Sequence, residues 1–156
     1  MNTIKFNNLA DCKYLVDQIA RYWQAEWSSD KSASGFEKQK QSILKKLNRD
    51  RAPLILVAHR GDEFIGSAAL FLNDLEARPD LSFWMGGIFT VPQYRGQGIA
   101  KALIEKIESK SKELGYNKIY LHTESAAGLY ASLGWQKLCD TITDQGEKTE
   151  IYYKNL

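Results

Sequence analysis

Two glycines, Gly96 and Gly98, stand where an apolar stretch of the sequence gives way to an amphipathic one, within the run TVPQYRGQGIAKAL. From Gln93 to Ile104 the sequence has no carboxylate, and the charged side chains there are Arg95 and Lys101. Helix starts usually favour Asp or Glu, because the helix dipole places roughly half a positive charge there. A helix start that is lined by glycine and free of acids can instead hold an anion on its backbone N–H groups.

Three phosphate-binding patterns can be compared with this turn. A Walker loop requires Gly-Lys followed by Ser or Thr, and Gly98–Lys101 does not supply it. A dinucleotide fingerprint requires a third glycine where this sequence has Lys101, and an acidic residue about twenty residues later, which is missing here. The third pattern, Arg/Gln-x-x-Gly-x-Gly/Ala, is matched in full by Arg95–Ala100. A plain strand-to-helix turn that needs glycine for its angle stays open as the alternative.

The composition is that of an ordinary globular protein. The chain has 156 residues, of which 44% are hydrophobic and 26% charged, and this predicts one domain over residues 1–156. The net charge of +2 comes from 21 basic and 19 acidic residues. A dedicated nucleic-acid or membrane-surface binder concentrates basic charge, so we expect no nucleic-acid partner and no membrane attachment.

The cysteines and the N-terminus indicate the compartment. Cys12 and Cys139 lie far apart, with no CxxC pair or Cys/His cluster, so we expect neither a metal site nor a disulfide framework. The first residues lack the basic segment and apolar stretch of a secretion signal, and the apolar runs are too short to span a membrane. We therefore expect a cytoplasmic protein.

The spacing of apolar residues predicts a mixed sheet with helices packed on it. Strands are predicted at 3–9, 54–60, 63–72, 81–91, 117–123, 135–143 and 148–156. Helices are predicted at 9–23, at a second segment that Pro53 ends and that carries Phe36, Ile43, Leu44 and Leu47 on one side, at 99–114 and at 125–134. The Gly86-Gly87 pair inside a strand indicates a bulge or a close backbone approach, and Ser125 is expected to cap the last helix.

Two motifs together resemble those of the GNAT superfamily of acyl-CoA-dependent N-acetyltransferases. Val91–Ile104 (VPQYRGQGIAKALI) resembles the family's pyrophosphate loop, and Leu129–Trp135 (LYASLGW) resembles its Leu-Tyr-x-x-Leu-Gly-Phe/Trp motif. The order of strands and helices is also similar over nearly the whole chain. The resemblance implies an α/β fold whose mixed, mostly antiparallel sheet of about six to seven strands is flanked by about four helices. That sheet is splayed between its fourth and fifth strands, and acetyl-CoA lies in the splay.

The same resemblance assigns residues to this cosubstrate. The backbone of the loop would hold the pyrophosphate, and the end of the fourth strand would bond the pantetheine arm and polarise the thioester carbonyl through an N–H near Phe89. Thr123 stands where many family members carry an Asn, so fewer bonds to the arm are expected. Arg95 and Gly96 would shape the turn. The other assigned residues are Ile88, Phe89, Thr90, Val91, Gln97, Gly98, Ile99, Ala100, Lys101 and Thr123.

Tyr130 falls where the family often has a tyrosine close to the thioester sulfur. In the reaction an amine attacks the acetyl carbon, an oxyanion forms and a thiolate leaves. A thiol has a pKa near ~8.5 and a phenol near ~10, so a positioned tyrosine can protonate the sulfur at neutral pH. Tyr130 is therefore the expected general acid, and a tyrosine that only packs on the sheet is the alternative.

The general base cannot lie on the fourth strand, because SFWMGGIFTV carries no Glu or Asp. An acceptor ammonium with a pKa near ~10.4 must lose a proton before its nitrogen attacks. His122 and Glu124 flank the end of the fifth strand and point the same way by strand alternation. They are the catalytic candidates, and a water chain to a distant acid is the alternative. Further carboxylates on the loop before the fourth strand are Asp74, Glu76 and Asp80.

The expected acceptor is the primary amine of a small molecule, which attacks acetyl-CoA directly in a ternary complex. Aromatic and acidic side chains suit a cationic amine, and the candidates are Trp27, Glu26, Asp74, Glu76 and Trp84. Trp84 can instead be a core residue. An amine on a protein or an aminoacyl-tRNA, and a module that senses acyl-CoA without turnover, stay open as alternatives, and so do a monomer and a homodimer.

Overall fold

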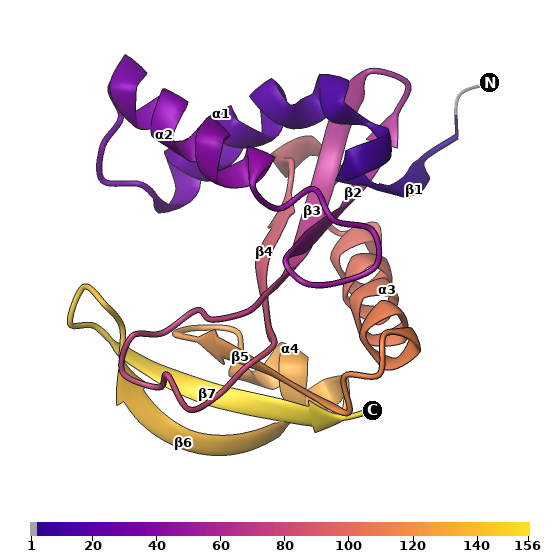
Figure 1. Cartoon of the computed structure of the whole chain (residues 1–156). Coiled ribbons are helices and arrows are strands. Elements are labelled where there is room, and N and C mark those ends of the chain that lie inside the picture. The colour runs from indigo at the N-terminus through magenta and orange to yellow at the C-terminus, as the bar shows by residue number, and fades with distance from the viewer. Residues whose placement is uncertain (1–2) are drawn as a thin grey trace.

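The computed structural model describes residues 3–156, in which seven strands form one sheet (Figure 1). The strands are β1 Lys5–Asn8, β2 Leu54–Arg60, β3 Glu63–Phe71, β4 Trp84–Thr90, β5 Lys118–Thr123, β6 Gln136–Ile142 and β7 Lys148–Asn155. The α-helices are α1 Val16–Trp27, α2 Ala33–Leu44, α3 Ile99–Glu113 and α4 Ala127–Ser132. The strand order is β1-β2-β3-β4-β5-β7-β6, and β4 and β5 are the parallel neighbours in an otherwise antiparallel sheet. This architecture confirms the predicted mixed sheet with helices packed on it.

The contact between β4 and β5 is very short. The two strands share one register pair, Trp84 with Tyr120, and the N–H of Tyr120 donates to the carbonyl of Phe83 at 2.9 Å. Beyond this pair β4 stays with β3, and β5 stays with β7. Figure 1 shows the consequence, because α1, α2 and β1 to β3 lie in one half of the molecule and β5 to β7 with α4 lie in the other. The predicted splay between the fourth and fifth strands is confirmed.

A bulge in β4 sets the direction in which its last residues face. The register between β3 and β4 shifts between Ser67 and Ala69, so β4 has an extra residue around Gly87. Gly87 has φ +58°, and a Cβ at this position would lie 2.7 Å from Cζ2 of Trp23. The extra residue changes the strand alternation and turns Phe89 toward α1. The bulge predicted in this glycine pair is confirmed, together with a close approach by Trp23.

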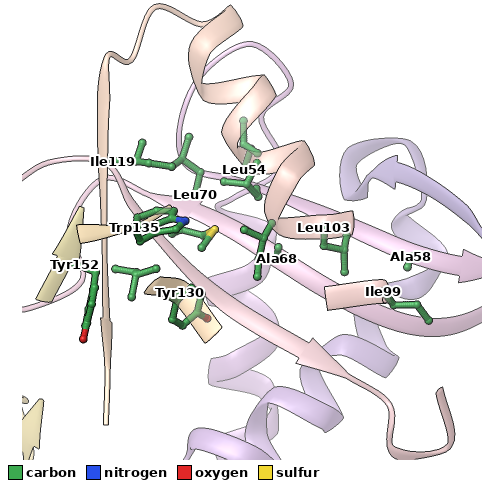
Figure 2. Packing of buried hydrophobic residues seen from close by; sticks show 14 of the residues in the cluster. Leu54, Ala58, Ala68, Leu70, Ile99, Leu103, Ile119, Tyr130, Trp135 and Tyr152 are labelled. Carbon is green, nitrogen blue, oxygen red and sulfur yellow. The ribbon is translucent and has the colours of Figure 1, made fainter. Parts of the chain in front are cut away.

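Apolar clusters cover both faces of the sheet. The cluster under α3 and α4 includes Tyr130 and Trp135 (Figure 2). The cluster on the opposite face lies under α1 and includes Trp23. A smaller cluster forms where the loop 72–83 covers the sheet near the splay, and it contains Leu75, Trp84 and Ile151. None of the helices within residues 3–156 is long and apolar enough to cross a membrane.

Predicted boundaries of the first, second and last helices were wrong, and α1 and α4 span Val16–Trp27 and Ala127–Ser132 instead of 9–23 and 125–134. The first helix begins at Val16 rather than at residue 9, because the side chain of Asn8 accepts the N–H of Ala10 at 2.8 Å and starts a separate 3-10 turn. The second helix ends at Leu44, whose side chain is 39% exposed rather than buried. The segment between α2 and β2 is a loop, so Pro53 does not end the helix.

Replacing Gly87 by alanine is expected to destabilise the protein more than replacing Gly61 by alanine. Both residues have φ near +60°, so each substitution has a backbone cost of about 1–2 kcal/mol. Gly61 faces open space, whereas a Cβ at Gly87 meets the Trp23 ring, which adds about 1–3 kcal/mol of overpacking. Urea denaturation measures both losses, and equal losses would contradict the close contact between Gly87 and Trp23.

Candidate active site

The turn between β4 and α3 presents open backbone N–H groups. Gly96 and Gly98 have φ +80° and +78°, and no atom lies within 4 Å of a Cβ built at either position. Gly98 precedes α3, whose first turn contains no acidic residue. In the described part of the chain, the N–H groups from Gly96 to Lys101 donate to no other backbone group. This helix start therefore has unused donors and a positive dipole end, which together favour an anion.

Two contacts hold this turn against the sheet. Nε of Arg95 donates to the carbonyl of Thr90 at 3.0 Å, and its guanidinium carbon lies 5.7 Å from the centre of the Phe89 ring. On β3, Gly66 has no side chain, and a Cβ there would lie 3.2 Å from Ile99 at the start of α3. The open N–H groups are thus placed beside the end of β4, where the sheet splays.

The end of β4 offers only part of its backbone to the splay. The N–H of Val91 donates to the carbonyl of Ile65 at 2.8 Å, so this pair is a hydrogen-bonded pair of the antiparallel ladder. Such pairs alternate along a ladder, so Phe89 also turns its N–H toward β3. The backbone groups of Ile88 and Thr90 face the other way, toward the gap. Since the carbonyl of Thr90 already accepts from Arg95, the groups on this side that a pantetheine arm could use are those of Ile88 and the N–H of Thr90.

Tyr130 lies in the apolar cluster on the face of the sheet covered by α3 and α4. Its side chain is 7% exposed, and its ring meets the edge of the Trp135 ring at a centroid distance of 6.2 Å (Figure 2). Burial raises the pKa of the Tyr130 hydroxyl, so the group is protonated at neutral pH. In the part of the chain that the structure describes, this hydroxyl donates to no protein acceptor within hydrogen-bond distance. A protonated, unengaged hydroxyl is available to donate a proton.

Thr123 positions the helix that carries Tyr130. Its Oγ1 accepts the N–H of Ala126 at 2.9 Å and that of Ser125 at 3.4 Å. These bonds hold the turn that leads into α4. The N-cap residue of α4 is Ala126 and has no side-chain cap bond, so the cap predicted at Ser125 is wrong. Since both bonds use the oxygen as acceptor, the hydroxyl proton of Thr123 remains free to donate.

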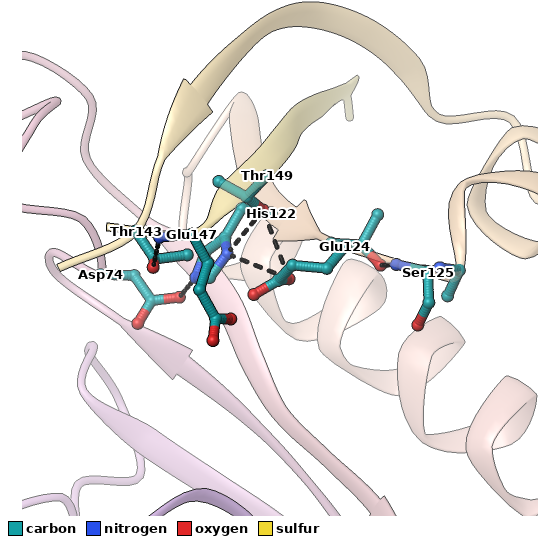
Figure 3. A network of polar contacts seen from close by, with 9 residues as sticks. Asp74, His122, Glu124, Ser125, Thr143, Glu147 and Thr149 are labelled. Carbon is teal, nitrogen blue, oxygen red and sulfur yellow. Dashed lines mark hydrogen bonds and ion pairs between the residues drawn. The ribbon is translucent and has the colours of Figure 1, made fainter. Parts of the chain in front are cut away.

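His122 lies at the centre of a polar network on the opposite face (Figure 3). Its Nε2 is 3.1 Å from Oδ2 of Asp74, and its Nδ1 is 3.2 Å from Oγ1 of Thr149. Thr149 in turn donates to Oε2 of Glu124 at 3.3 Å. The loop 72–83, β5 and β7 each contribute to this network, which links two carboxylates through one imidazole and one hydroxyl.

The network lies at the mouth of the splay. His122 lies two positions after Tyr120, the β5 residue that pairs with β4, and a Cβ at Gly86 on β4 would lie 3.5 Å from Oδ2 of Asp74. Trp84, which is fully buried, meets the His122 ring edge-on at a centroid distance of 6.1 Å. Trp84 therefore packs against the His122 ring and has no exposed surface that a substrate could contact. His122 and Tyr130 approach the gap from opposite faces of the sheet.

The carboxylates around His122 favour its charged form. Burial lowers the pKa of His122, but the hydrogen bond to Asp74 and the charges of Asp74, Glu124 and Asp144 outweigh it. The pKa of His122 therefore lies above its ordinary value. The site combines one imidazolium with several carboxylates, so its net charge is negative.

Residues 15–135 match the family model described as Acetyltransferase (GNAT) family. This chain belongs to the GNAT family of acetyltransferases. It is 32% identical over 108 residues to N-acetyltransferase 8 of Rattus norvegicus, which covers 65% of this chain and 48% of the relative. It is also 32% identical over 105 residues to an acetyltransferase of Pectobacterium atrosepticum, which covers 65% of this chain and 69% of the relative. The chain thus spans about half the length of the rat relative that it matches.

Solved structures of GNAT acetyltransferases share the fold. An aminoglycoside 6'-N-acetyltransferase complexed with coenzyme A has a TM-score of 0.75 and 14% identity, with 97% of this chain and 96% of that chain covered. A Bacillus anthracis protein assigned as a streptothricin acetyltransferase, in complex with acetyl-CoA, has a TM-score of 0.60 and 19% identity, with coverage of 73% and 68%. Identities of this size establish the common fold.

The other residues predicted to bind the acceptor or to act as the base differ in exposure and in their partners. Trp27 is 52% exposed and lies edge-on to Phe89, so it offers an aromatic surface beside the end of β4. Glu26 and Glu76 are exposed, and the backbone N–H of Glu76 donates to Asp144 at 3.1 Å. Asp80 is engaged by Arg78 in two hydrogen bonds of 3.0 and 2.9 Å, which lower its pKa. It is a weaker base candidate than the network around His122.

Thr149 is the residue of this GNAT site that the sequence did not reveal. It is 3% exposed and lies on β7, beside the end of β5. Its place next to His122 depends on the register of two strands separated by α4 and β6. A threonine early in a strand carries no signal of such a role.

The pKa of His122 is expected to exceed about 6.5, the ordinary value for histidine, and Asp74→Asn is expected to lower it. The sign follows from the carboxylate partners, which stabilise the imidazolium in the folded state. The resulting stability is fully present below pH ~6.5 and is lost as the pH rises through the folded-state pKa. NMR titration of the imidazole measures the pKa. Asp80→Asn is the matched control, since Asp80 pairs with Arg78, and an unchanged His122 pKa in Asp74→Asn would contradict the assignment.

Proposed function

We propose that this GNAT chain transfers the acetyl group of acetyl-CoA to the primary amine of a small cationic molecule by direct attack in a ternary complex. The observation that carries the proposal is the open, acid-free series of N–H groups from Gly96 to Lys101 beside the splay. Acetyl-CoA would supply the activated thioester. The backbone at this turn would hold its pyrophosphate, with Arg95 and Gly96 shaping the turn.

The chain's own groups divide the remaining work between the two faces of the sheet. The backbone of Ile88 and the N–H of Thr90 would bond the pantetheine arm, and an N–H next to Phe89 would stabilise the oxyanion. Tyr130 would protonate the leaving thiolate from the side of α4, and the hydroxyl of Thr123 would donate to the arm. His122 and Glu124 would accept the proton of the incoming ammonium from the other side.

The charge of the acceptor side supports a cationic amine. Asp74 and Glu124 contact His122 at the mouth of the splay, and Asp144 lies close enough to influence its pKa. Trp27 adds an exposed aromatic face, and such faces attract ammonium groups. A solved structure of similar fold is named an aminoglycoside acetyltransferase, and aminoglycosides are polycationic amines. We extend that chemical class, rather than that substrate, to this chain.

Gly98→Asp is expected to weaken acetyl-CoA binding about tenfold relative to Gly98→Asn, which corresponds to about 1.4 kcal/mol. Both side chains tolerate the left-handed backbone at this position, and they differ mainly in charge. Only aspartate places an anion at the helix start that is expected to hold the pyrophosphate. Titration calorimetry with acetyl-CoA measures both affinities. Equal dissociation constants would remove this turn from the phosphate-binding role.

Tyr130→Phe is expected to lower kcat about 100-fold, the lower end of the range for loss of a general acid, with little change in acetyl-CoA affinity. The ring keeps its packing against Trp135, so the thermal stability should hold. Release of free CoA thiol measures turnover, and calorimetry measures binding. A variant with the wild-type rate would show that Tyr130 only packs.

An acceptor screen separates the proposed reaction from its alternatives. Spermidine and kanamycin represent small cationic amines, and peptides with a free N-terminus or lysine represent protein acceptors. Transfer to the first group supports the proposal, and transfer only to peptides would replace the acceptor class. If acetyl-CoA binds and no acceptor reacts, a sensing module becomes the better assignment.

A further inference from the structure

We propose that Glu124, Thr149 and His122 form a proton relay that removes the proton from the acceptor ammonium, with Thr149 as the residue that positions and passes it. This inference rests on the proposed acetyl transfer. It adds to that function a path, a direction and a residue for the deprotonation step. The three groups lie in sequence, with Thr149 Oγ1 at 3.3 Å from Glu124 Oε2 and at 3.2 Å from His122 Nδ1 (Figure 3).

The orientation of the Thr149 hydroxyl and the charge of His122 determine each other in this arrangement. A threonine hydroxyl has one proton, and here Thr149 donates it to Glu124. Thr149 can then only accept from His122, so Nδ1 of the ring carries a proton. Nε2 faces the carboxylate of Asp74, which only accepts when ionised, so Nε2 carries a proton as well. The arrangement is that of a charged imidazolium.

A neutral His122 requires the opposite orientation of the Thr149 hydroxyl. Asp74 keeps the proton on Nε2, which leaves the lone pair on Nδ1. The group in contact with that lone pair is Thr149, so its hydroxyl must turn to donate to the ring. Its own lone pair then faces Glu124. The orientation of one buried hydroxyl therefore follows the charge of His122.

The change between these two orientations of the Thr149 hydroxyl can carry one proton from the acceptor amine to His122. The ammonium gives a proton to the carboxylate of Glu124, and its N–H bond is replaced by an O–H bond. The Glu124 carboxyl passes that proton to Oγ1 of Thr149, as the original Thr149 proton moves to Nδ1 of His122. At the end the amine is neutral, Glu124 is again a carboxylate, Thr149 is again a hydroxyl and His122 is charged. No electron changes hands, and no further reactant is needed.

Burial gives the relay its direction. The side chain of Glu124 is 44% exposed, that of His122 is 20% exposed, and Thr149 is 3% exposed as a residue. Glu124 also borders a hollow of about 650 Å³ beside the hairpin of β6 and β7. Glu124 is therefore the group that an amine in solution can reach, and His122 is the group that stores the proton.

The surroundings of His122 stabilise the stored proton. Asp74 faces the ring from the loop 72–83, Glu124 from β5, and Asp144 from the turn between β6 and β7. From β4 the ring meets the apolar edge of Trp84. Glu147 belongs to the same turn as Asp144, and its backbone N–H donates to Oγ1 of Thr143 at 3.1 Å. Among the described residues, no positive side chain other than His122 forms an ion pair with Asp74 or Glu124.

Thr149→Val and Thr149→Ser test the relay as a matched pair. Valine keeps the shape of threonine and removes the hydroxyl, whereas serine keeps the hydroxyl. With spermidine or kanamycin as acceptor, Thr149→Val is expected to lower kcat about 100-fold and to abolish the rise of kcat through the His122 titration. Thr149→Ser is expected to retain most of the rate, and both variants should bind acetyl-CoA like the wild type.

A double substitution separates a relay from independent structural effects. Glu124→Gln and Thr149→Val interrupt the same path, so the double variant should be no slower than the slower single variant. Additive losses would overturn the relay. A wild-type rate and pH profile in Thr149→Val, or an equal loss in Thr149→Ser, would also overturn it.

The NMR titration of His122 tests the Thr149–His122 contact, on which the relay depends, independently of any acetyl transfer. Removal of the hydroxyl that accepts from Nδ1 is expected to lower the His122 pKa in Thr149→Val but not in Thr149→Ser. If the wild type binds acetyl-CoA and transfers to no amine, the proposed function fails on its own. If the His122 pKa is the same in both variants, the relay fails whatever the activity.

Discussion

The early separation of β4 and β5 is the constraint on which the rest of this structure depends. Backbone groups removed from water need partners, and after the pair Trp84–Tyr120 each strand finds them on its outer side only. The inner edge of β4 is left with backbone groups of Ile88 and the N–H of Thr90, while the carbonyl of Thr90 accepts from Arg95. A ligand with amide groups of its own, such as a pantetheine arm, can complete that edge, and the short β4–β5 contact keeps the place for it open.

The two faces of the sheet give this gap two different chemistries. From the side of α3 and α4 comes Tyr130, a buried phenol whose pKa is raised by burial. From the other side comes His122, held between carboxylates. A leaving thiolate needs a proton donor, and an incoming ammonium needs a proton acceptor. The phenol of Tyr130 and the network around His122 lie on opposite faces of the sheet and could serve these two needs. The bulge at Gly87 sets the phase of β4, and thereby which of its residues face each side.

Positive and negative potential are also separated along the gap. The start of α3 has open N–H groups and no acid in its first turn, so it favours the anionic end of acetyl-CoA. The carboxylates gather instead around His122, contributed by a loop, a strand and a hairpin turn that are distant in sequence. Both preferences are local, since interactions between exposed charges fall off over roughly 8–10 Å at physiological salt. One protein of nearly balanced charge can therefore attract an anion and a cation to two ends of one site.

The sequence by itself determined the glycine turn and the seven strands, because these depend on local spacing, backbone conformation and apolar periodicity. The family, and with it the splay between the fourth and fifth strands, followed from the resemblance of two motifs to those of GNAT proteins. It also placed His122 and Glu124 on one side of their strand, since alternation is a local rule. Only the tertiary structure decided that Thr149 joins them, that Asp74 rather than Asp80 reaches the imidazole and that Trp84 is buried beneath it. Those relations depend on the register of β5 against β7 and on how the loop 72–83 folds over the sheet. Register and loop packing are fixed by contacts between segments far apart in the chain, and no pattern within any one segment encodes them.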